Sequence, residues 1–294
     1  MQSDSTGEPF AGLWTTPFGP VRLTANASGV AGSYRYGEIE GQLEGAVSGD
    51  TLRFRYRESG TVGEGWFQLD AEAECFDGQW RAESATEWSA WTGQRLRAEP
   101  GVTWLVVLEA HWQRGLAEND YAYGNMLGEV FARLPNVRVR QRFFHDAHSL
   151  ERWCGDLLYL AEPAIVLIAS HGVADGLSVR GEVINASRLL DILRPAGNLR
   201  LVHFAACLVG QDSQKTFENQ KFPISGYAGN VDWGSSLLLE MTYLDLILNR
   251  GMEPVAAAEA LPKVIAWSGD EVEADSPYAA ACFRFYPALP VTEA

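Results

Sequence analysis

Two matched segments decide the fold expected for the second half of this chain: Ala164-Ile-Val-Leu-Ile-Ala-Ser-His-Gly172 and Leu199-Arg-Leu-Val-His-Phe-Ala-Ala-Cys207. Each is a short apolar run rich in branched residues, which is typical of a buried strand in a parallel sheet. The first run ends at His171 and the second at Cys207. Functional groups of open α/β sheets collect beyond the carboxyl ends of the strands, so we expect these two side chains to meet there.

A thiol and an imidazole at neighbouring strand ends would form an activated nucleophile. Cys207 is the candidate nucleophile, and His171 is the candidate base and acid that would later protonate the leaving amine. The backbone N–H groups of Gly172 and Cys207 are the candidate oxyanion hole. Each assignment has a structural alternative, namely a packed thiol, a histidine that caps a strand end and a glycine needed by a turn. The other cysteines are interpreted as packing residues: Cys75, Cys154 and Cys282.

After residue 99 the pattern alternates between strands and helices, which predicts a parallel sheet with crossover helices. Strands are expected at about 103–108, 137–144, 164–170, 199–206 and 222–227, and helices at about 119–134, 146–160, 186–193, 232–249 and 254–267. A small hairpin is expected over 173–184. The helix over 232–249 is apolar almost all round, so we expect it to be buried.

This order of elements resembles the caspase-like cysteine peptidases, with Ser170-His171-Gly172 closing one apolar block and Ala206-Cys207 closing the next. Gly210 and the segment Ile224-Ser-Gly-Tyr-Ala-Gly-Asn-Val-Asp-Trp233 resemble the bacterial CHAT members of that clan. The resemblance covers about residues 101–270. It implies a caspase-hemoglobinase-like α/β domain, with a mostly parallel sheet flanked by helices, that uses a His–Cys dyad to cleave protein substrates.

The resemblance also implies where a substrate side chain would be recognised. Ala205 stands where caspases carry a glutamine that helps to hold an acidic P1 residue, so cleavage after aspartate is not expected. CHAT and separase relatives place an acidic residue after the strand expected over 222–227, and Asp232 matches that position best. Asp232 would bind a P1 Arg or Lys through a charge-assisted hydrogen bond, although an aspartate here is also a good helix N-cap.

The first 98 residues have a different pattern, in which glycine recurs between short alternating segments such as Leu52-Arg-Phe-Arg-Tyr56. Leu52, Phe54 and Tyr56 would point to one face and the arginines to the other. About seven or eight antiparallel strands in this length predict a small barrel or sandwich, loosely similar to lipocalin-like or avidin-like barrels. Such a barrel either holds one small ligand or is filled by side chains.

The predicted organisation is an antiparallel β domain over 1–98 and a peptidase domain over 99–294, joined at Glu99-Pro100-Gly101. The net charge of −15 argues against nucleic acid and anionic membranes as partners, because phosphate contact needs a basic face. No apolar run reaches the roughly 18 residues of a membrane span, and the first residues lack the features of a signal peptide. Four scattered cysteines suit a reducing compartment, so we expect a cytoplasmic protein.

The expected partner is a protein or peptide substrate, and no cofactor or metal is expected. The polar segment 210–221 lies where caspases carry a processed linker, so cleavage there by the enzyme itself or by an upstream protease is one hypothesis for regulation, and a partner protein is another. Two alternative functions stay open. One is a zinc-binding hydrolase, because the zinc-ligand types at strand ends are His111, His145, His171 and Cys207. The other is an inactive peptidase fold kept for binding.

Overall fold

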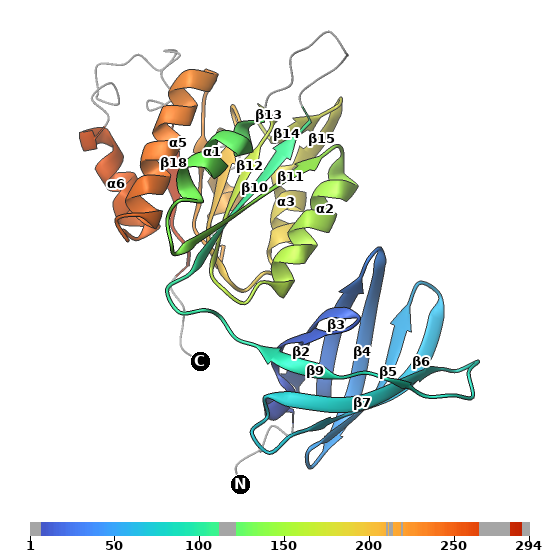
Figure 1. Ribbon diagram of the computed structural model, residues 1–294. Helices are drawn as coiled ribbons and strands as arrows, with labels where there is room; N and C mark the ends of the chain where they lie inside the picture. The colour runs from blue at the N-terminus through green and yellow to red at the C-terminus, as the bar shows by residue number, and fades with distance from the viewer. Residues whose placement is uncertain are drawn as a thin grey trace. The chain divides into compact units, whose positions relative to one another are not determined.

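The computed structural model describes residues 7–111, 122–209, 211, 214–218, 220–264 and 283–289. The chain divides into two compact units, Met1–Ala98 and Glu99–Ala294. The first unit carries strands β1 to β9, and the second carries β10 to β18 together with helices α1 to α6 (Figure 1).

The first unit is a closed antiparallel barrel. A short 3-10 turn, η1 (Glu8–Phe10), precedes the strands β1 (Gly12–Thr16), β2 (Gly19–Asn26), β3 (Gly29–Tyr36), β4 (Ile39–Ser48), β5 (Thr51–Glu58), β6 (Thr61–Leu69), β7 (Cys75–Ala82), β8 (Ser89–Ala90) and β9 (Gly93–Leu96). Strands β1 to β7 pair in chain order, and β9 pairs with both β7 and β1, which closes a ring of eight strands. The two-residue strand β8 pairs with β7 beside β9.

The interior of the barrel is filled by side chains, most of them aromatic. Phe67 and Phe76 stack with ring centroids 4.0 Å apart, and Trp91 packs edge-on against Phe67 at 5.2 Å. Glycines make room for these rings, because a Cβ added at Gly41 would lie 2.0 Å from the Tyr34 ring. The barrel is therefore a packed core of the kind usual for small barrels.

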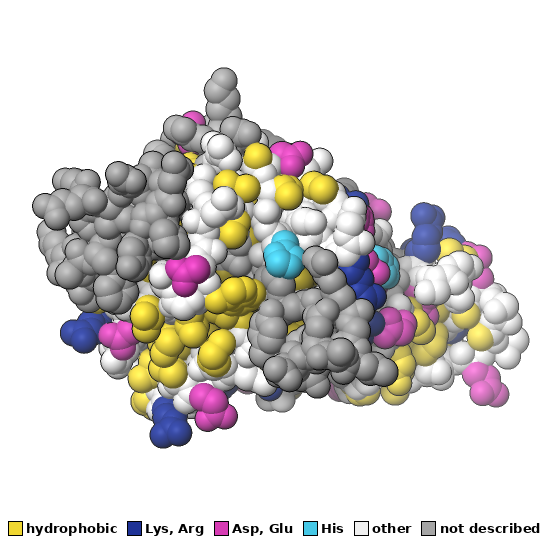
Figure 2. Space-filling model, turned by 90° about the horizontal axis from the view of Figure 1, so that it is seen from above, with side chains coloured by type: hydrophobic (Ala, Val, Ile, Leu, Met, Phe, Trp, Pro, Cys, Tyr) yellow, Lys and Arg dark blue, Asp and Glu magenta, His cyan; other side chains and the backbone are white. Residues whose placement is uncertain are grey.

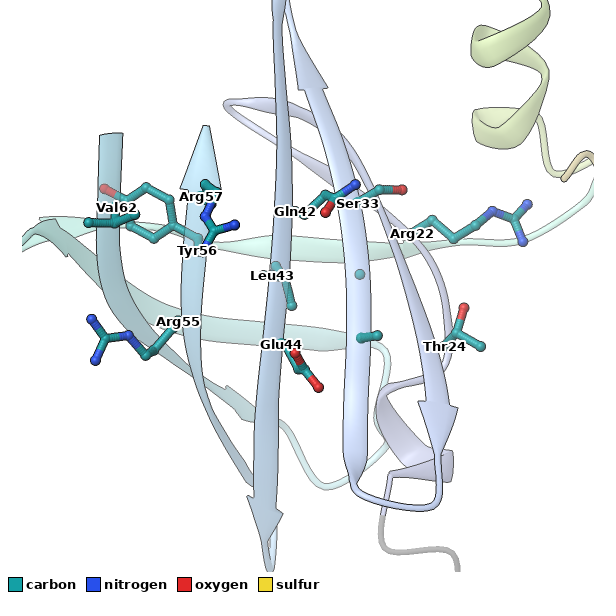
Figure 3. Close-up of a pocket in the computed structure, with 12 residues that line it drawn as sticks. Arg22, Thr24, Ser33, Gln42, Leu43, Glu44, Arg55, Tyr56, Arg57 and Val62 are labelled. Carbon is teal, nitrogen blue, oxygen red and sulfur yellow. The ribbon is translucent and has the colours of Figure 1, made fainter. Parts of the chain in front are cut away.

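A depression of about 730 Å³ lies over strands β2 to β6 of the barrel (Figure 3). It is lined mostly by side chains of the polar face, which alternate along the strands with core residues. One row across β2, β3, β4 and β5 consists of Arg22, Ser33, Gln42 and Arg57. The depression therefore belongs mainly to the polar surface of the sheet.

The second unit is built on a six-stranded sheet in the order β11-β10-β12-β16-β17-β18. The strands are β10 (Thr103–Ala110), β11 (Val137–Phe144), β12 (Ala164–Ala169), β16 (Leu199–Ala205), β17 (Ile224–Tyr227) and β18 (Phe283–Tyr286). All of them run parallel except β18, which is antiparallel to β17. Every residue of β12 is buried, as expected for a continuous apolar run covered on both faces.

Helices cover both faces of this sheet (Figure 1). Their bounds are α1 (Tyr123–Phe131), α2 (Ala147–Asp156), which is followed by the turn η2 (Leu157–Tyr159), α3 (Ala186–Leu193), α4 (Gln214–Phe217), α5 (Trp233–Leu248) and α6 (Pro254–Val264). One core cluster joins α2 and α3 to one face, and a second joins α1, α5 and α6 to the other. No helix in the described ranges is long and apolar enough to cross a membrane.

A small three-stranded antiparallel sheet follows β12 directly. Its strands are β13 (His171–Val173), β14 (Gly176–Val179) and β15 (Glu182–Asn185). Leu177 and Ile184 are fully buried in the core that also holds α3, so this sheet is anchored to the second unit. It begins two residues earlier than the hairpin expected over 173–184 and therefore includes His171.

The expected fold class is wrong. We expected a caspase-hemoglobinase-like α/β domain with a mostly parallel sheet, preceded by a small antiparallel barrel or sandwich, but 12 of the 16 strand pairings in the described part are antiparallel. The described part of the chain is mostly antiparallel sheet, with an eight-stranded closed barrel and six helices. The sequence interpretation gave too much weight to the apolar runs of the second half, although the alternating segments supply most of the strand pairing.

Candidate active site

The parallel register between β12 and β16 sets the position of the two candidate catalytic residues. Ala169 pairs with Ala205 at the last step of the ladder, and the Ser170 N–H donates to the Ala205 carbonyl at 3.4 Å. His171 and Cys207 each stand two residues beyond that pair. Equal offsets from a paired register bring the two residues to the same edge of the sheet.

His171 and Cys207 line a common cavity of about 50 Å³. The remaining lining residues come from strand ends and from the starts of α1 and α5: Tyr123, Ser170, Ala205, Ala206, Val231, Trp233 and Ser236. His171 is exposed and Cys207 is half-buried, so both can be reached from solvent. Figure 2 looks onto the side to which the parallel strands point, where histidine and hydrophobic side chains lie at the surface.

The Cys207 side chain is held against the main chain that follows β17. The Val231 N–H donates to Sγ at 3.4 Å, and Sγ lies 3.6 Å from the Val231 carbonyl oxygen. The next residue, Leu208, has a φ of 62°, and its N–H donates to the Gly229 carbonyl at 3.1 Å. A left-handed backbone at a non-glycine residue costs about 1–3 kcal/mol, and such residues cluster at active sites as well as occurring in turns.

Gly172 is pressed against the backbone of Cys207. A Cβ added at Gly172 would lie 1.7 Å from the Cys207 carbonyl oxygen and 2.8 Å from the Cys207 nitrogen. Only glycine allows main chains to approach this closely. The two residues expected to form the oxyanion hole are therefore neighbours in space.

Asp232 is placed at the start of helix α5 and is not one of the cavity-lining residues. Its Oδ1 accepts hydrogen bonds from the N–H groups of Gly234 and Ser235, both at 3.0 Å. Burial alone would raise the pKa of Asp232, but the hydrogen bonds from Ser235 and Gly234 outweigh it and lower the pKa. Asp232 is thus the N-cap of α5, and neither cap hydrogen bond uses Oδ2.

Sequence reasoning missed a buried polar cluster in the same sheet. His203 Nδ1 lies 2.8 Å from Ser225 Oγ, and Nε2 lies 3.1 Å from Glu240 Oε1. The Tyr227 hydroxyl donates to the same Glu240 oxygen at 2.9 Å. Complete burial lowers the pKa of His203 to about 3 and raises the pKa of Glu240, so burial favours the neutral form of both groups. The signals in the sequence are His203 inside the apolar run of β16, which is interpreted as a core residue, and Glu240 between apolar residues of α5.

The zinc alternative requires several ligands in one place. His111 and His145 follow β10 and β11, and their ring centroids lie 5.3 Å apart. Among the described residues, no group of three or more His, Cys, Asp or Glu side chains could hold a metal ion. This alternative therefore has no ligand set in the part of the chain that the structure describes.

The remaining cysteines differ in their surroundings. Cys75 is exposed on β7, so its interpretation as a packing residue is wrong. Cys154 is buried on α2, and burial raises the pKa of its thiol. Cys282 lies outside the described residues. Of the cysteines in the described ranges, Cys207 is the one that lines a cavity together with a histidine.

Comparison with known proteins adds little to this geometry. No family model matches the chain, and no curated protein matches it. Caspase-1 from Spodoptera frugiperda is a similar solved structure, with 11% identity, a TM-score of 0.43, and coverage of 63% of this chain and 86% of the caspase-1 chain. These values are too low to assign a family or an activity. The resemblances to CHAT proteins and to lipocalin-like or avidin-like barrels stay predictions.

Proposed function

We propose that this protein is a cysteine endopeptidase in which Cys207 is the nucleophile and His171 transfers the proton. The observation that supports the proposal is the shared cavity, because an imidazole and a thiol from successive parallel strands line one opening at the sheet edge. Nucleophilic catalysis needs the nucleophile and base to face the same substrate atom. The exposure of His171 and the partial exposure of Cys207 allow a polypeptide to reach both.

The proposed reaction has two stages. In the first, the sulfur of Cys207 bonds to the peptide carbonyl carbon while His171 accepts the thiol proton. The resulting tetrahedral oxyanion collapses, the C–N bond breaks, and His171 gives its proton to the leaving amine. In the second, water attacks the thioester with His171 as base, which releases the carboxylic acid and restores the thiol.

Gly172 and Cys207 would hold the oxyanion through their backbone N–H groups. The close approach of the two backbones supports this role, since a Cβ on Gly172 would overlap the Cys207 carbonyl oxygen. Backbone donors held by tertiary packing need no rearrangement when charge develops on the substrate oxygen.

Asp232 is our sequence-based prediction for the residue that binds a basic P1 side chain. Its Oδ1 caps α5, and the two cap hydrogen bonds leave Oδ2 unused. Pairing with Arg or Lys would therefore not require the cap to break. Peptides that differ only in P1 Arg or P1 Ala test this prediction, because equal turnover of the two would contradict it.

We also propose that residues 210–221 regulate the enzyme, through cleavage or through a partner protein. Residues 210, 212–213 and 219 lie outside the described residues. Phe217, on α4, is buried and stacks on Phe204 with ring centroids 5.5 Å apart, so a cut beside it would disturb the core behind β16. The intact mass of the fully active protein tests the cleavage hypothesis, and an uncut segment would contradict it.

The experiment that tests the proposed activity is a digest of a proteome-derived peptide library. Wild-type protein and the Cys207→Ala variant are incubated with the same library, and new termini are identified by mass spectrometry. We expect cleavage by the wild type and none by the variant. Equal cleavage by both proteins, or by neither, would contradict the proposal.

A further inference from the structure

The cavity beside Cys207 is small, and its described walls carry no permanent charge. Its volume of about 50 Å³ corresponds to roughly three or four water-sized groups. Apart from His171 and the thiol, its described lining consists of aromatic, small aliphatic and hydroxyl-bearing residues. A basic or acidic side chain would have neither the room nor a charged partner inside it.

Two aromatic residues from separate elements bound this cavity. Tyr123 is almost fully buried, and its N–H donates to the Glu109 carboxylate at 2.7 Å, which fixes that wall. Trp233 is 44% exposed at the first residue of α5, and its ring centroid lies 5.6 Å from that of Tyr123. Tyr123 is thus a fixed part of the cavity lining. The indole of Trp233 is partly exposed, so a smaller residue can replace it without opening the core.

We infer that this cavity binds the P1 side chain, that it accepts only small uncharged residues such as Gly, Ala and Ser, and that Trp233 sets its size. The inference rests on the proposed peptidase function, because P1 is defined by attack of Cys207 on the following bond. A side chain next to the scissile carbonyl must lie beside the attacking sulfur, and Cys207 itself lines this cavity. Ser170 and Ser236 line the same cavity.

This inference competes with the sequence-based prediction that Asp232 binds a basic P1 residue. Asp232 is absent from the cavity lining, and its Oδ1 is occupied by the cap of α5. The size and neutrality of the cavity therefore favour a small P1 residue. One set of substrates decides between the two specificities.

The test uses a peptide series in which only P1 changes, through Gly, Ala, Ser, Val, Leu, Phe, Arg and Glu. The full-length wild type, Trp233→Ala, Trp233→Phe and Asp232→Asn are compared by kcat/KM, with Cys207→Ala as the inactive reference. Trp88→Ala is the matched control, because Trp88 is 39% exposed in the barrel and is remote in sequence from the cavity. Circular dichroism confirms that each variant is folded.

We expect the wild type to cleave after Gly, Ala or Ser at least about tenfold faster than after Leu, Phe or Arg. Trp233→Ala should raise the ratio of kcat/KM for P1 Leu or Phe to kcat/KM for P1 Ala by about tenfold or more, with Trp233→Phe in between. Trp88→Ala should reproduce the wild-type profile.

Two results would overturn the inference while leaving the proposed function intact. One is a wild-type preference for P1 Arg that Asp232→Asn removes. The other is a P1 profile that Trp233→Ala does not change. A third result, no cleavage that depends on Cys207, would instead remove the proposed function and this specificity together.

Discussion

Two histidine-containing regions adjoin strand β16, one beyond its carboxyl end and one in its middle, and they differ in almost every physical respect. At its carboxyl end, Cys207 lies beside an exposed His171, and both line a cavity. In its middle, His203 is completely buried with Ser225 and Glu240 and has a pKa lowered to about 3 by desolvation. The histidine side chain is thus exposed at one site, whereas at the other burial disfavours its protonated form.

The difference shows that position along a buried strand decides what an imidazole can do. Within the strand, both faces are covered, so the ring must be neutral and hydrogen-bonded. Beyond Ala169, the last paired residue of β12, the backbone leaves the core, so the His171 ring is exposed to solvent. The pairing of β12 with β16 still fixes the position of the His171 backbone. We therefore expect the first region to control activity and the second to control stability.

The largest expected effect comes from removing the imidazole of His171. His171→Ala should lower kcat/KM by about 10²- to 10⁴-fold, as loss of a general base and acid does, without changing the urea midpoint. Peptide cleavage and urea unfolding of the same preparation measure both quantities. A His171→Ala variant that is unstable but fully active per folded molecule would break the comparison.

A second prediction concerns the backbone next to His171. Gly172→Ala should reduce kcat by about 10²- to 10³-fold, because its Cβ would overlap the Cys207 carbonyl oxygen and displace the proposed oxyanion donors. Gly197→Ala is the matched control, since a Cβ there meets nothing within 4 Å. Wild-type kcat in both variants would show that the approach of the two main chains has no catalytic role.

The buried His203 cluster should make the free energy of unfolding depend on pH. Unfolded His203 takes up a proton below pH 6.5, whereas folded His203 does so only near pH 3, so the wild type loses stability as pH falls through this window. The expected slope is at most about 1.4 kcal/mol per pH unit relative to His203→Gln. The raised pKa of Glu240 acts in the opposite direction, above about pH 4.5, in both proteins.

Urea unfolding of wild type and His203→Gln at several values between pH 4 and pH 7 measures this difference. Activity per folded molecule near pH 7 should be the same for the two proteins. Parallel stability curves would mean that His203 titrates normally in the folded state, which would contradict the description of the buried cluster.

The smallest expected effect lies at the start of α5, the helix that links the two regions. Asp232→Ala should destabilise the protein by about 1 kcal/mol through loss of the N-cap, whereas Asp232→Asn should keep the cap and most of the stability. Thermal or urea unfolding of the two variants measures this. Equal losses would indicate that the charge of Asp232, and not its hydrogen bonds, stabilises the helix.

Elements with a strong local signal could be predicted from the sequence. Continuous apolar runs gave β12 and β16 to within one residue, α3 lies over 186–193 as expected, and Asp232 marked the start of α5 as its N-cap. The four-residue strand β18 was missed because so short a segment has no distinctive period.

Features that depend on distant segments could not be predicted. Helix α1 begins at Tyr123 after an N-cap residue, Ala122, that makes no side-chain cap hydrogen bond, and its first N–H groups donate instead to Glu109 on β10. Tyr123 and Trp233 meet at the cavity from helices far apart in the chain. The barrel closes through the pairing of β9 with β1, which no local pattern in residues 1–98 specifies.

The most direct test of the proposed active site compares thiols within one molecule. The protein is treated with a pool of peptidyl acyloxymethyl ketones of varied P1, and the modified cysteines are identified by mass spectrometry. Because such probes need an activated thiol, we expect the half-buried Cys207 to be labelled before the exposed Cys75, and labelling to be lost in His171→Ala. Labelling that follows exposure, with Cys75 modified and Cys207 untouched, would contradict the account.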